Sequence, residues 1–80
     1  MTIKILFFGI SSDLVKSTEI SFLLEQKATV HDCKEALIKQ FPKLKIINSF
    51  AIAVNENYAT DEVSLKNGDV VAIIPPVSGG

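Results

Sequence analysis

This sequence has few of the residues that build catalytic or metal sites. Its 80 residues include one cysteine, one histidine and no tryptophan. One cysteine cannot form an intramolecular disulfide, and one cysteine with one histidine cannot complete a structural zinc site. Eight basic residues against nine acidic residues give a formal net charge of -1. The sequence therefore shows no basic footprint for nucleic acid or for an anionic membrane.

Long apolar runs are also missing. The stretch Ile5–Ile10 is too short for the core of a signal peptide, and no stretch approaches the length of a membrane span. Hydrophobic residues still make up 48% of the chain, which is too many for a disordered protein. Eighty residues suffice for one core and exclude a two-domain enzyme with an interdomain cleft. We expect a small, soluble, cytoplasmic protein.

Alternating apolar residues predict two strands at the N-terminus. The odd positions of residues 2–8 are all apolar, whereas the even positions include Lys4, so one face of this strand is half solvated. Gly9 ends the strand, and the Ser-Ser-Asp run that follows could cap a single helical turn through Val15. Residues 18–24 alternate again, so the two runs predict an antiparallel pair.

The clearest helix follows, over residues 30–41. Thr29 is its predicted N-cap, with Asp32 three residues on as a weaker form of the capping box. Pro42 stops the helix at or near Phe41. Its apolar stripe comprises Val30, Cys33, Leu37 and Phe41, widened by Ile38.

The second half of the chain predicts three more strands. Residues 50–54 alternate, the Asn-Glu-Asn turn at residues 55–57 leads to a short segment at Tyr58, and Asn-Gly-Asp at residues 67–69 precedes a last strand over residues 70–74. This order predicts an α+β fold of the ubiquitin-like β-grasp type. Its mixed sheet has four to five strands, with one main helix packed on one face. A ferredoxin-like sandwich needs a second long helix, which is absent from the pattern.

The titratable residues do not suggest catalysis by this chain alone. His31 falls in the first turn of the helix, where a lone histidine is usually just solvated. Cys33 lies on the apolar stripe, where a free cysteine behaves as a small hydrophobe. The carboxylates of Glu56, Asp61 and Glu62 flank a loop and are expected to be solvated. The sequence predicts no metal site and no bound cofactor.

The end of the chain is unusual. We divide the sequence into a β-grasp domain over residues 1–74 and an extended tail over residues 75–80. The tail reads Pro75, Pro76, Val77, Ser78, Gly79 and Gly80. Two prolines end strand pairing and direct the chain away as a stiff lead. The five to six residues of the tail can then reach about 15–20 Å from the sheet at ~3.3 Å each. Two glycines can pass a narrow channel, and a terminal glycine carboxylate is an unhindered acyl group. The plain alternative is a frayed terminus.

The sequence also resembles a known family over nearly its whole length. Residues 3–8, 13–14, 50–55 and 67–80 look like the matching parts of the small subunits of molybdopterin synthase. The most specific part is the strand that ends in Pro-Pro-Val-Ser-Gly-Gly. Family members often carry an Arg-Glu pair where this chain has Ser12 and Asp13. This chain therefore lacks the arginine side chain for any contact that the family makes with it.

The resemblance implies a sulfur carrier that does not itself catalyse. An adenylyltransferase of the ubiquitin-activating type would use ATP to adenylate the Gly80 carboxylate. A persulfide donor would then convert it to a thiocarboxylate. The large subunit of the synthase, in a heterotetramer with the carrier, would hold the catalytic residues and pass the sulfur to cyclic pyranopterin monophosphate. The tail residues 75–79 would thread into that active site.

Docking to both partners needs an apolar patch near the tail, on the sheet face that the helix leaves open. We predict that Phe8, Tyr58 and Ile74 belong to it, the positions at which the resembled family places partner contacts. Three alternative functions remain open from the sequence: a ubiquitin-like protein modifier, a sulfur carrier for tRNA thiolation or thiamine synthesis, and a passive binding module.

Overall fold

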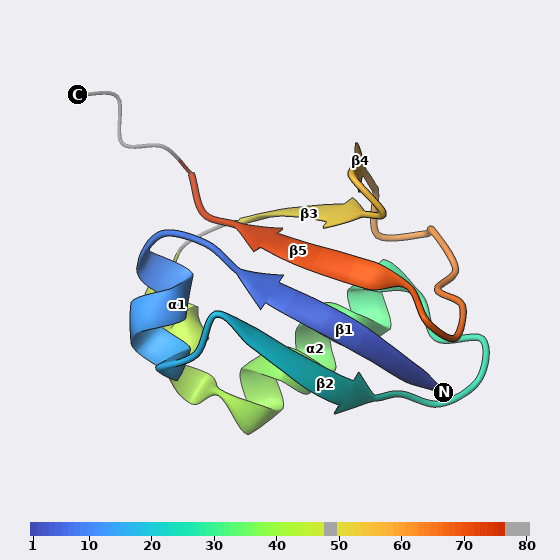
Figure 1. Ribbon diagram of the computed structural model, residues 1–80, viewed down its shortest axis with the longest axis horizontal. Helices are drawn as coiled ribbons and strands as arrows, with labels where there is room; N and C mark the ends of the chain where they lie inside the picture. The colour runs from blue at the N-terminus through green and yellow to red at the C-terminus, as the bar shows by residue number, and fades with distance from the viewer. Residues whose placement is uncertain (48–49, 77–80) are drawn as a thin grey trace.

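The alternating segments pair into one sheet, and the amphipathic segment forms the main helix. The computed structural model describes residues 1–47 and 50–76 (Figure 1). The elements are β1 (Thr2–Phe7), α1 (Ile10–Val15), β2 (Glu19–Leu23), α2 (Val30–Gln40), the 3-10 helix η1 (Pro42–Ile46), β3 (Ala51–Val54), β4 (Asn57–Tyr58) and β5 (Val70–Ile74). The predicted strands and main helix are confirmed to within one or two residues at each end.

The sheet has five strands in the order β2-β1-β5-β3-β4. β1 pairs with β2 antiparallel and with β5 parallel, while β3 pairs antiparallel with both β5 and β4. The prediction of a mixed sheet is therefore confirmed. Because β1 and β5 run in the same direction, both end at the same edge of the sheet, and the chain leaves β5 beside the end of β1 (Figure 1).

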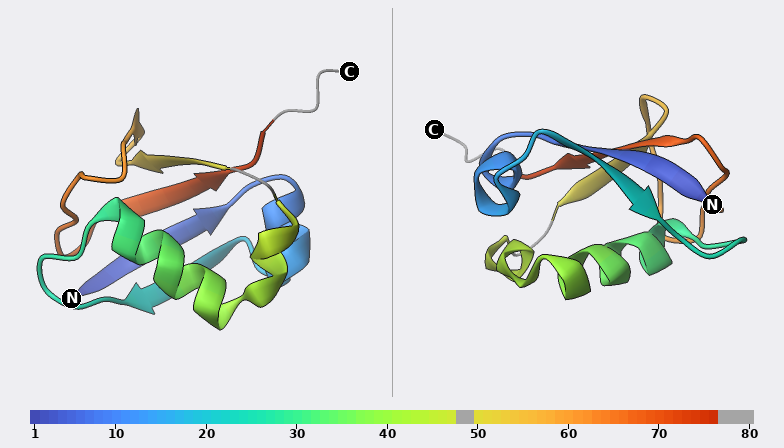
Figure 2. Two further views of the ribbon diagram at one scale, coloured as in Figure 1. Left: turned by 180° about the vertical axis from the view of Figure 1, so that it is seen from behind. Right: turned by 60° about the horizontal axis from the view of Figure 1, so that its bottom comes forward.

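One face of the sheet is covered by α2, as the view from behind shows (Figure 2). The odd positions of β1 are buried there, as the alternation predicts. The helix contributes its predicted stripe, in which Val30, Cys33 and Leu37 are fully buried. The other members of the core are Phe22, Leu44, Ile47, Ile52, Leu65, Val71 and Ile73.

The start of α2 is fixed by the predicted capping box. The Thr29 hydroxyl accepts a hydrogen bond from the Asp32 N–H at 3.3 Å, and the Asp32 carboxylate accepts one from the Thr29 N–H at 2.9 Å. These two bonds satisfy amide groups that the first helical turn leaves without a partner. At the other end Phe41 is the C-cap, and Pro42 starts η1, an element that the sequence did not predict.

The first helix differs from the prediction. α1 begins at Ile10, with Gly9 as its N-cap, and no side chain caps it. The hydroxyls of Ser11 and Ser12 instead donate backward, to the carbonyls of Phe8 at 2.6 Å and Gly9 at 2.8 Å. The expectation that these serines cap the helical turn was therefore wrong, because they lie inside the turn and brace the chain that precedes it.

We expect Leu37→Ala to lower the free energy of unfolding by about 2–5 kcal/mol, because the truncation leaves a cavity between α2 and the sheet. Leu37 is fully buried. Urea denaturation measures the change. Gln40→Ala, an exposed position on the same helix, is the control and should stay within about 0.5 kcal/mol of the wild type. Equal losses in the two variants would contradict this packing.

Candidate functional site

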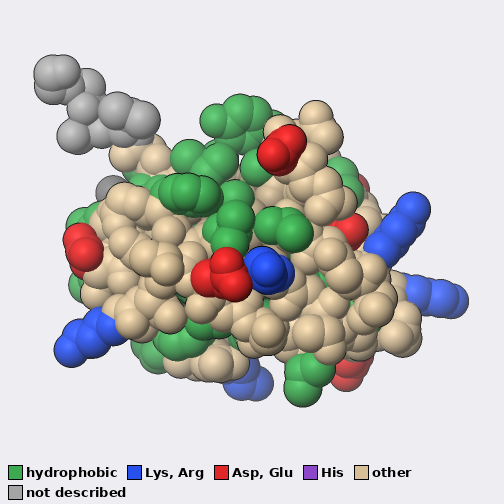
Figure 3. All heavy atoms as spheres, in the orientation of Figure 1, with side chains coloured by type: hydrophobic (Ala, Val, Ile, Leu, Met, Phe, Trp, Pro, Cys, Tyr) green, Lys and Arg blue, Asp and Glu red, His purple; other side chains and the backbone are tan. Residues whose placement is uncertain are grey.

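The face of the sheet opposite α2 carries apolar side chains beside an exposed ion pair between Lys4 and Glu19. The strand register aligns Leu6 with Ala72, Ala72 with Ala53, and Ala53 with Tyr58, so four strands contribute one row of side chains. The space-filling view shows hydrophobic side chains gathered over β1 and β5, toward the end where the chain leaves β5 (Figure 3). We call this surface the open face.

The three residues predicted to dock a partner all lie on the open face. Phe8 is 50% exposed and Tyr58 is 76% exposed, whereas Ile74 is half-buried. Phe8 follows the last residue of β1, yet its N–H still donates to the carbonyl of Ile73 at 3.3 Å. It therefore stays beside β5, next to Ile74. The exposed aromatic side chains give the open face the character of a docking surface, and their role in binding stays a prediction.

A shallow groove of about 460 Å³ crosses the open face. Leu6, Phe8, Val70 and Ala72 line it, and Asn55 and Glu56 close one end. The Asn55 side chain accepts a hydrogen bond from the Val70 N–H and donates one to the Asp69 carboxylate, both at 3.0 Å. Sequence reasoning identified residues 55–57 only as a turn and missed this polar end, because the partners lie about 15 residues away.

The tail begins at the other end of the groove. Pro75 and Pro76 directly follow β5, as the sequence predicts. A Cβ atom placed on Gly9 would lie 3.8 Å from the Pro75 Cγ, so the first tail residue lies against the turn that ends β1. The remaining predicted tail residues, Val77, Ser78, Gly79 and Gly80, lie outside the described residues.

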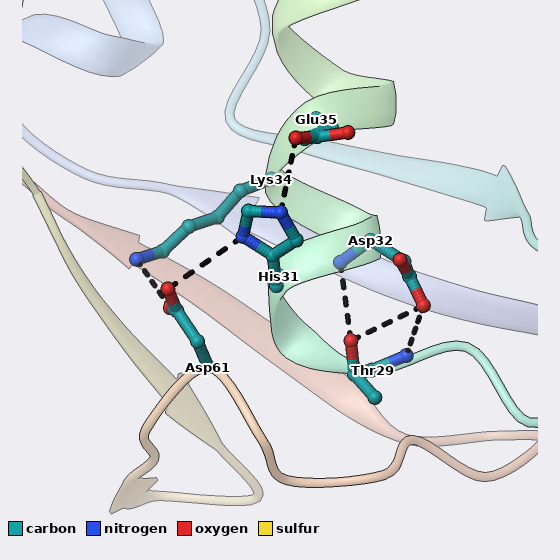
Figure 4. A network of polar contacts seen from close by, with 6 residues as sticks. All are labelled: Thr29, His31, Asp32, Lys34, Glu35 and Asp61. Carbon is teal, nitrogen blue, oxygen red and sulfur yellow. Dashed lines mark hydrogen bonds and ion pairs between the residues drawn. The ribbon is translucent and has the colours of Figure 1, made fainter.

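A separate polar network lies at the start of α2 (Figure 4). The Lys34 ammonium contacts the Asp61 carboxylate at 2.8 Å, and the His31 imidazole lies 3.0 Å from the Glu35 carboxylate and 3.6 Å from that of Asp61. The hydrogen bond from Lys34 lowers the pKa of Asp61 below its usual value. The network joins the loop between β4 and β5 to α2, so Asp61 has a structural role beyond the solvated one that we expected.

The remaining titratable candidates behave as the sequence predicts. His31 is exposed. Cys33 is buried, and that burial raises the pKa of its thiol to about 11, so the thiolate is scarce at neutral pH.

Within residues 1–47 and 50–76, no three His, Cys, Asp or Glu side chains are grouped to hold a metal ion. The helices in this described part are all too short or too polar to cross a membrane.

The sequence pattern of the ThiS family matches residues 5–80 of this chain. The chain belongs to the ThiS family. Two relatives, both named molybdopterin synthase sulfur carrier subunit, agree with it over almost its full length. The Chlamydomonas reinhardtii protein is 37% identical, with all of both chains covered. The Arabidopsis thaliana protein is 34% identical over 98% of this chain and 82% of its own.

Solved structures confirm the β-grasp fold of this ThiS-family chain. Subunit 1 of a molybdopterin converting factor from Pyrococcus furiosus is 30% identical, with a TM-score of 0.87 over 96% of this chain and 99% of its own. A Helicobacter pylori complex of subunits 1 and 2 of the molybdopterin-converting factor matches at 27% identity and a TM-score of 0.71, with both chains fully covered. The backbone on which the open face lies is thus shared with these proteins.

We expect the stability of this ThiS-family protein to fall as the pH drops below about 4. The backbone hydrogen bond from Thr29 lowers the pKa of Asp32, and the hydrogen bond from Lys34 lowers that of Asp61. A carboxyl group whose pKa is lower in the folded state stabilises the fold above its unfolded pKa. That stabilisation is lost as the pH falls through the folded pKa.

Thermal unfolding followed by circular dichroism between pH 2 and pH 7 measures this loss. The variants Asp32→Asn and Asp61→Asn should each show a shallower decline than the wild type, since each lacks one of the titrating groups. Asp13→Asn, at an exposed aspartate of α1, is the control and should follow the wild-type curve. Parallel curves for all four proteins would contradict the assignment.

Proposed function

We propose that this chain is the sulfur-carrier subunit of a molybdopterin synthase. The observation that carries the proposal is the extent of the sequence match. The alignments with the relatives named as that subunit cover 98% and 100% of the chain. The match to the family pattern extends to Gly80 itself. The similarity therefore includes the Gly-Gly terminus that a carrier needs, in addition to the fold.

The proposed chemistry takes place at the terminal carboxylate. A carboxylate oxygen of Gly80 attacks the α-phosphate of ATP in an activating enzyme, which forms an acyl-adenylate and releases pyrophosphate. The outer sulfur of a persulfide attacks the acyl carbon, forms a C–S bond and expels AMP. A second thiol of the donor then cleaves the S–S bond that the persulfide brought, which forms a disulfide on the donor and leaves a thiocarboxylate on Gly80. That sulfur is then transferred to cyclic pyranopterin monophosphate, and hydrolysis returns the carboxylate. Two deliveries complete one dithiolene.

The described residues fit a carrier whose catalytic groups belong to its partners. Cys33 is buried and its thiol pKa is raised, which makes it a poor nucleophile. Lys34 and Asp61 form an ion pair beside His31 at the start of α2, whereas the tail begins at the end of β5. The chain thus offers its terminal acyl group and a surface for recognition.

The open face supports two protein partners, used in turn. One is the large subunit of the synthase, and the Helicobacter pylori structure holds the corresponding two subunits in a complex. The other is an adenylyltransferase of the ubiquitin-activating type. Both partners must bind the domain close to the tail, where Phe8 and Ile74 present apolar surface. We place these encounters in the cytoplasm.

Intact-protein mass spectrometry tests the terminal chemistry. We expect incubation with ATP, an activating partner and sulfide to replace one oxygen of the chain with sulfur. Deletion of Gly80 should abolish the change, and Cys33→Ala should preserve it. Sulfur bound to a cysteine would instead add the full mass of a sulfur atom, because no oxygen is lost. Fragmentation of the product should locate the sulfur on the last residue.

Other products of the same incubation would contradict the proposal. Isopeptide conjugates between Gly80 and lysines of other proteins, with no sulfur in the chain, would show a protein modifier. Unchanged mass with several activating partners, together with full function after deletion of Gly79 and Gly80, would show a passive binding module.

We expect Tyr58→Ala to weaken binding of the large subunit about tenfold or more, because aromatic side chains dominate the energy of such interfaces. Tyr58 is 76% exposed, so its truncation should scarcely change the melting temperature. Isothermal titration calorimetry with the large subunit measures the affinity.

The matched control is Leu23→Ala. Leu23 is 77% exposed and pairs with Thr2 on the open face, at the end of the sheet away from the tail. Its truncation should leave the affinity near that of the wild type. If Leu23→Ala weakens binding as much as Tyr58→Ala, the docking surface does not lie near the tail.

A further inference from the structure

The turn between β1 and α1 has an unusual backbone and is tightly braced. Gly9 has φ of 55° and ψ of -137°, close to the first central position of a type II′ turn, where glycine dominates. The Phe8 carbonyl accepts hydrogen bonds from the backbone and hydroxyl of Ser11 at 3.2 and 2.6 Å. The Gly9 carbonyl accepts the same pair of bonds from Ser12 at 3.1 and 2.8 Å. The serines therefore hold the turn in one geometry.

This braced turn lies against the first residue of the tail. Because β1 and β5 are parallel neighbours, the turn after Phe7 and the chain after Ile74 emerge side by side, as both ribbon views show (Figures 1 and 2). A Cβ atom on Gly9 would lie 3.8 Å from the Pro75 Cγ. The bare Cα of Gly9 thus faces the pyrrolidine ring that starts the tail.

We propose that Gly9 is a positioning residue that sets the direction in which the tail leaves the domain. This inference rests on the proposed function for its consequence, since a carrier must present Gly80 to an active site. Any residue with a Cβ is strained at this backbone conformation, so a substitution shifts the turn on which Pro75 packs. Pro75 and Pro76 have fixed φ angles, so a shift of this turn changes the direction in which the chain leaves the sheet at Pro76.

The expected consequence is slow chemistry rather than weak docking. Gly80 lies five residues beyond Pro75, at most about 17 Å along a fully extended chain, so the direction in which the chain leaves the domain limits where the terminal carboxylate can reach. A misplacement of about 1 Å can slow a reaction by about 100-fold. The open face keeps its side chains, so the affinity of the domain for its partner should change little.

Gly68 provides a matched control. It also has a positive φ, of 87°, and a Cβ placed there would meet no atom within 4 Å. It lies in the turn before β5, at the end of that strand opposite the tail. Gly68→Ala therefore introduces the same methyl group and a similar backbone strain without touching Pro75. The two variants should lose similar thermal stability and differ only in what happens to the tail.

The first experiment compares the steady-state kinetics of Gly80 adenylation by an activating partner, measured as pyrophosphate release. Gly9→Ala should lower kcat about tenfold or more with KM for the carrier nearly unchanged. Gly68→Ala should keep both constants close to those of the wild type at a temperature where all three proteins are folded. Equal kcat values for the two variants would overturn the proposal, as would a rise in KM alone.

A second measurement tests whether Gly9 positions the tail, and it does not depend on the chemistry of Gly80. In NMR spectra of the whole chain, a nuclear Overhauser effect should connect the Gly9 Hα protons with the Pro75 ring. Gly9→Ala should shift the amide resonances of residues 77–80, and Gly68→Ala should not. Unshifted tail resonances in Gly9→Ala overturn the positioning role. If Gly9→Ala shows these shifts but the wild-type chain is never adenylated, the sulfur-carrier function is contradicted and the role of Gly9 stays intact.

Discussion

The parallel pairing of β1 with β5 is the contact on which the rest of this molecule depends. It joins strands from opposite ends of the sequence at the centre of the sheet. Parallel neighbours end at the same edge, so the turn after β1 becomes the surface against which the tail begins. Without this pairing Gly9 and Pro75 would not be neighbours, and the tail would not begin beside the open face.

The two faces of the sheet differ in burial because a single long helix can cover only one of them. Burial beneath α2 stabilises a domain of this size, and its side chains come from every long strand. The opposite face keeps an apolar row that no element of the described chain covers. An exposed row of this kind costs solubility, and a protein partner that covers it removes that cost. The same chain therefore combines a buried core with an open apolar face.

Most of the local structure could be predicted from neighbouring residues. Alternation in residues 2–8 correctly separated the buried side chains from the open ones, and Thr29 with Asp32 gave the start of α2. Some failures were local, since Ser11 and Ser12 donate to carbonyls three residues back instead of capping α1. The others involve contacts between distant parts of the chain. Asp61 binds Lys34 across 27 residues, and Asn55 binds Asp69 across 14. No pattern within a short window contains both partners of such a pair.

The sequence of the terminus by itself predicts an extended tail with an accessible carboxylate, since proline fixes φ and glycine has no side chain. Which residues surround the root of that tail was decided only on folding. Gly9 and Pro75 are 66 positions apart, and they meet because strand pairing brings β1 and β5 together. Backbone hydrogen bonds between distant strands have no preference for particular side chains. Their register therefore emerges from the packing of the whole core.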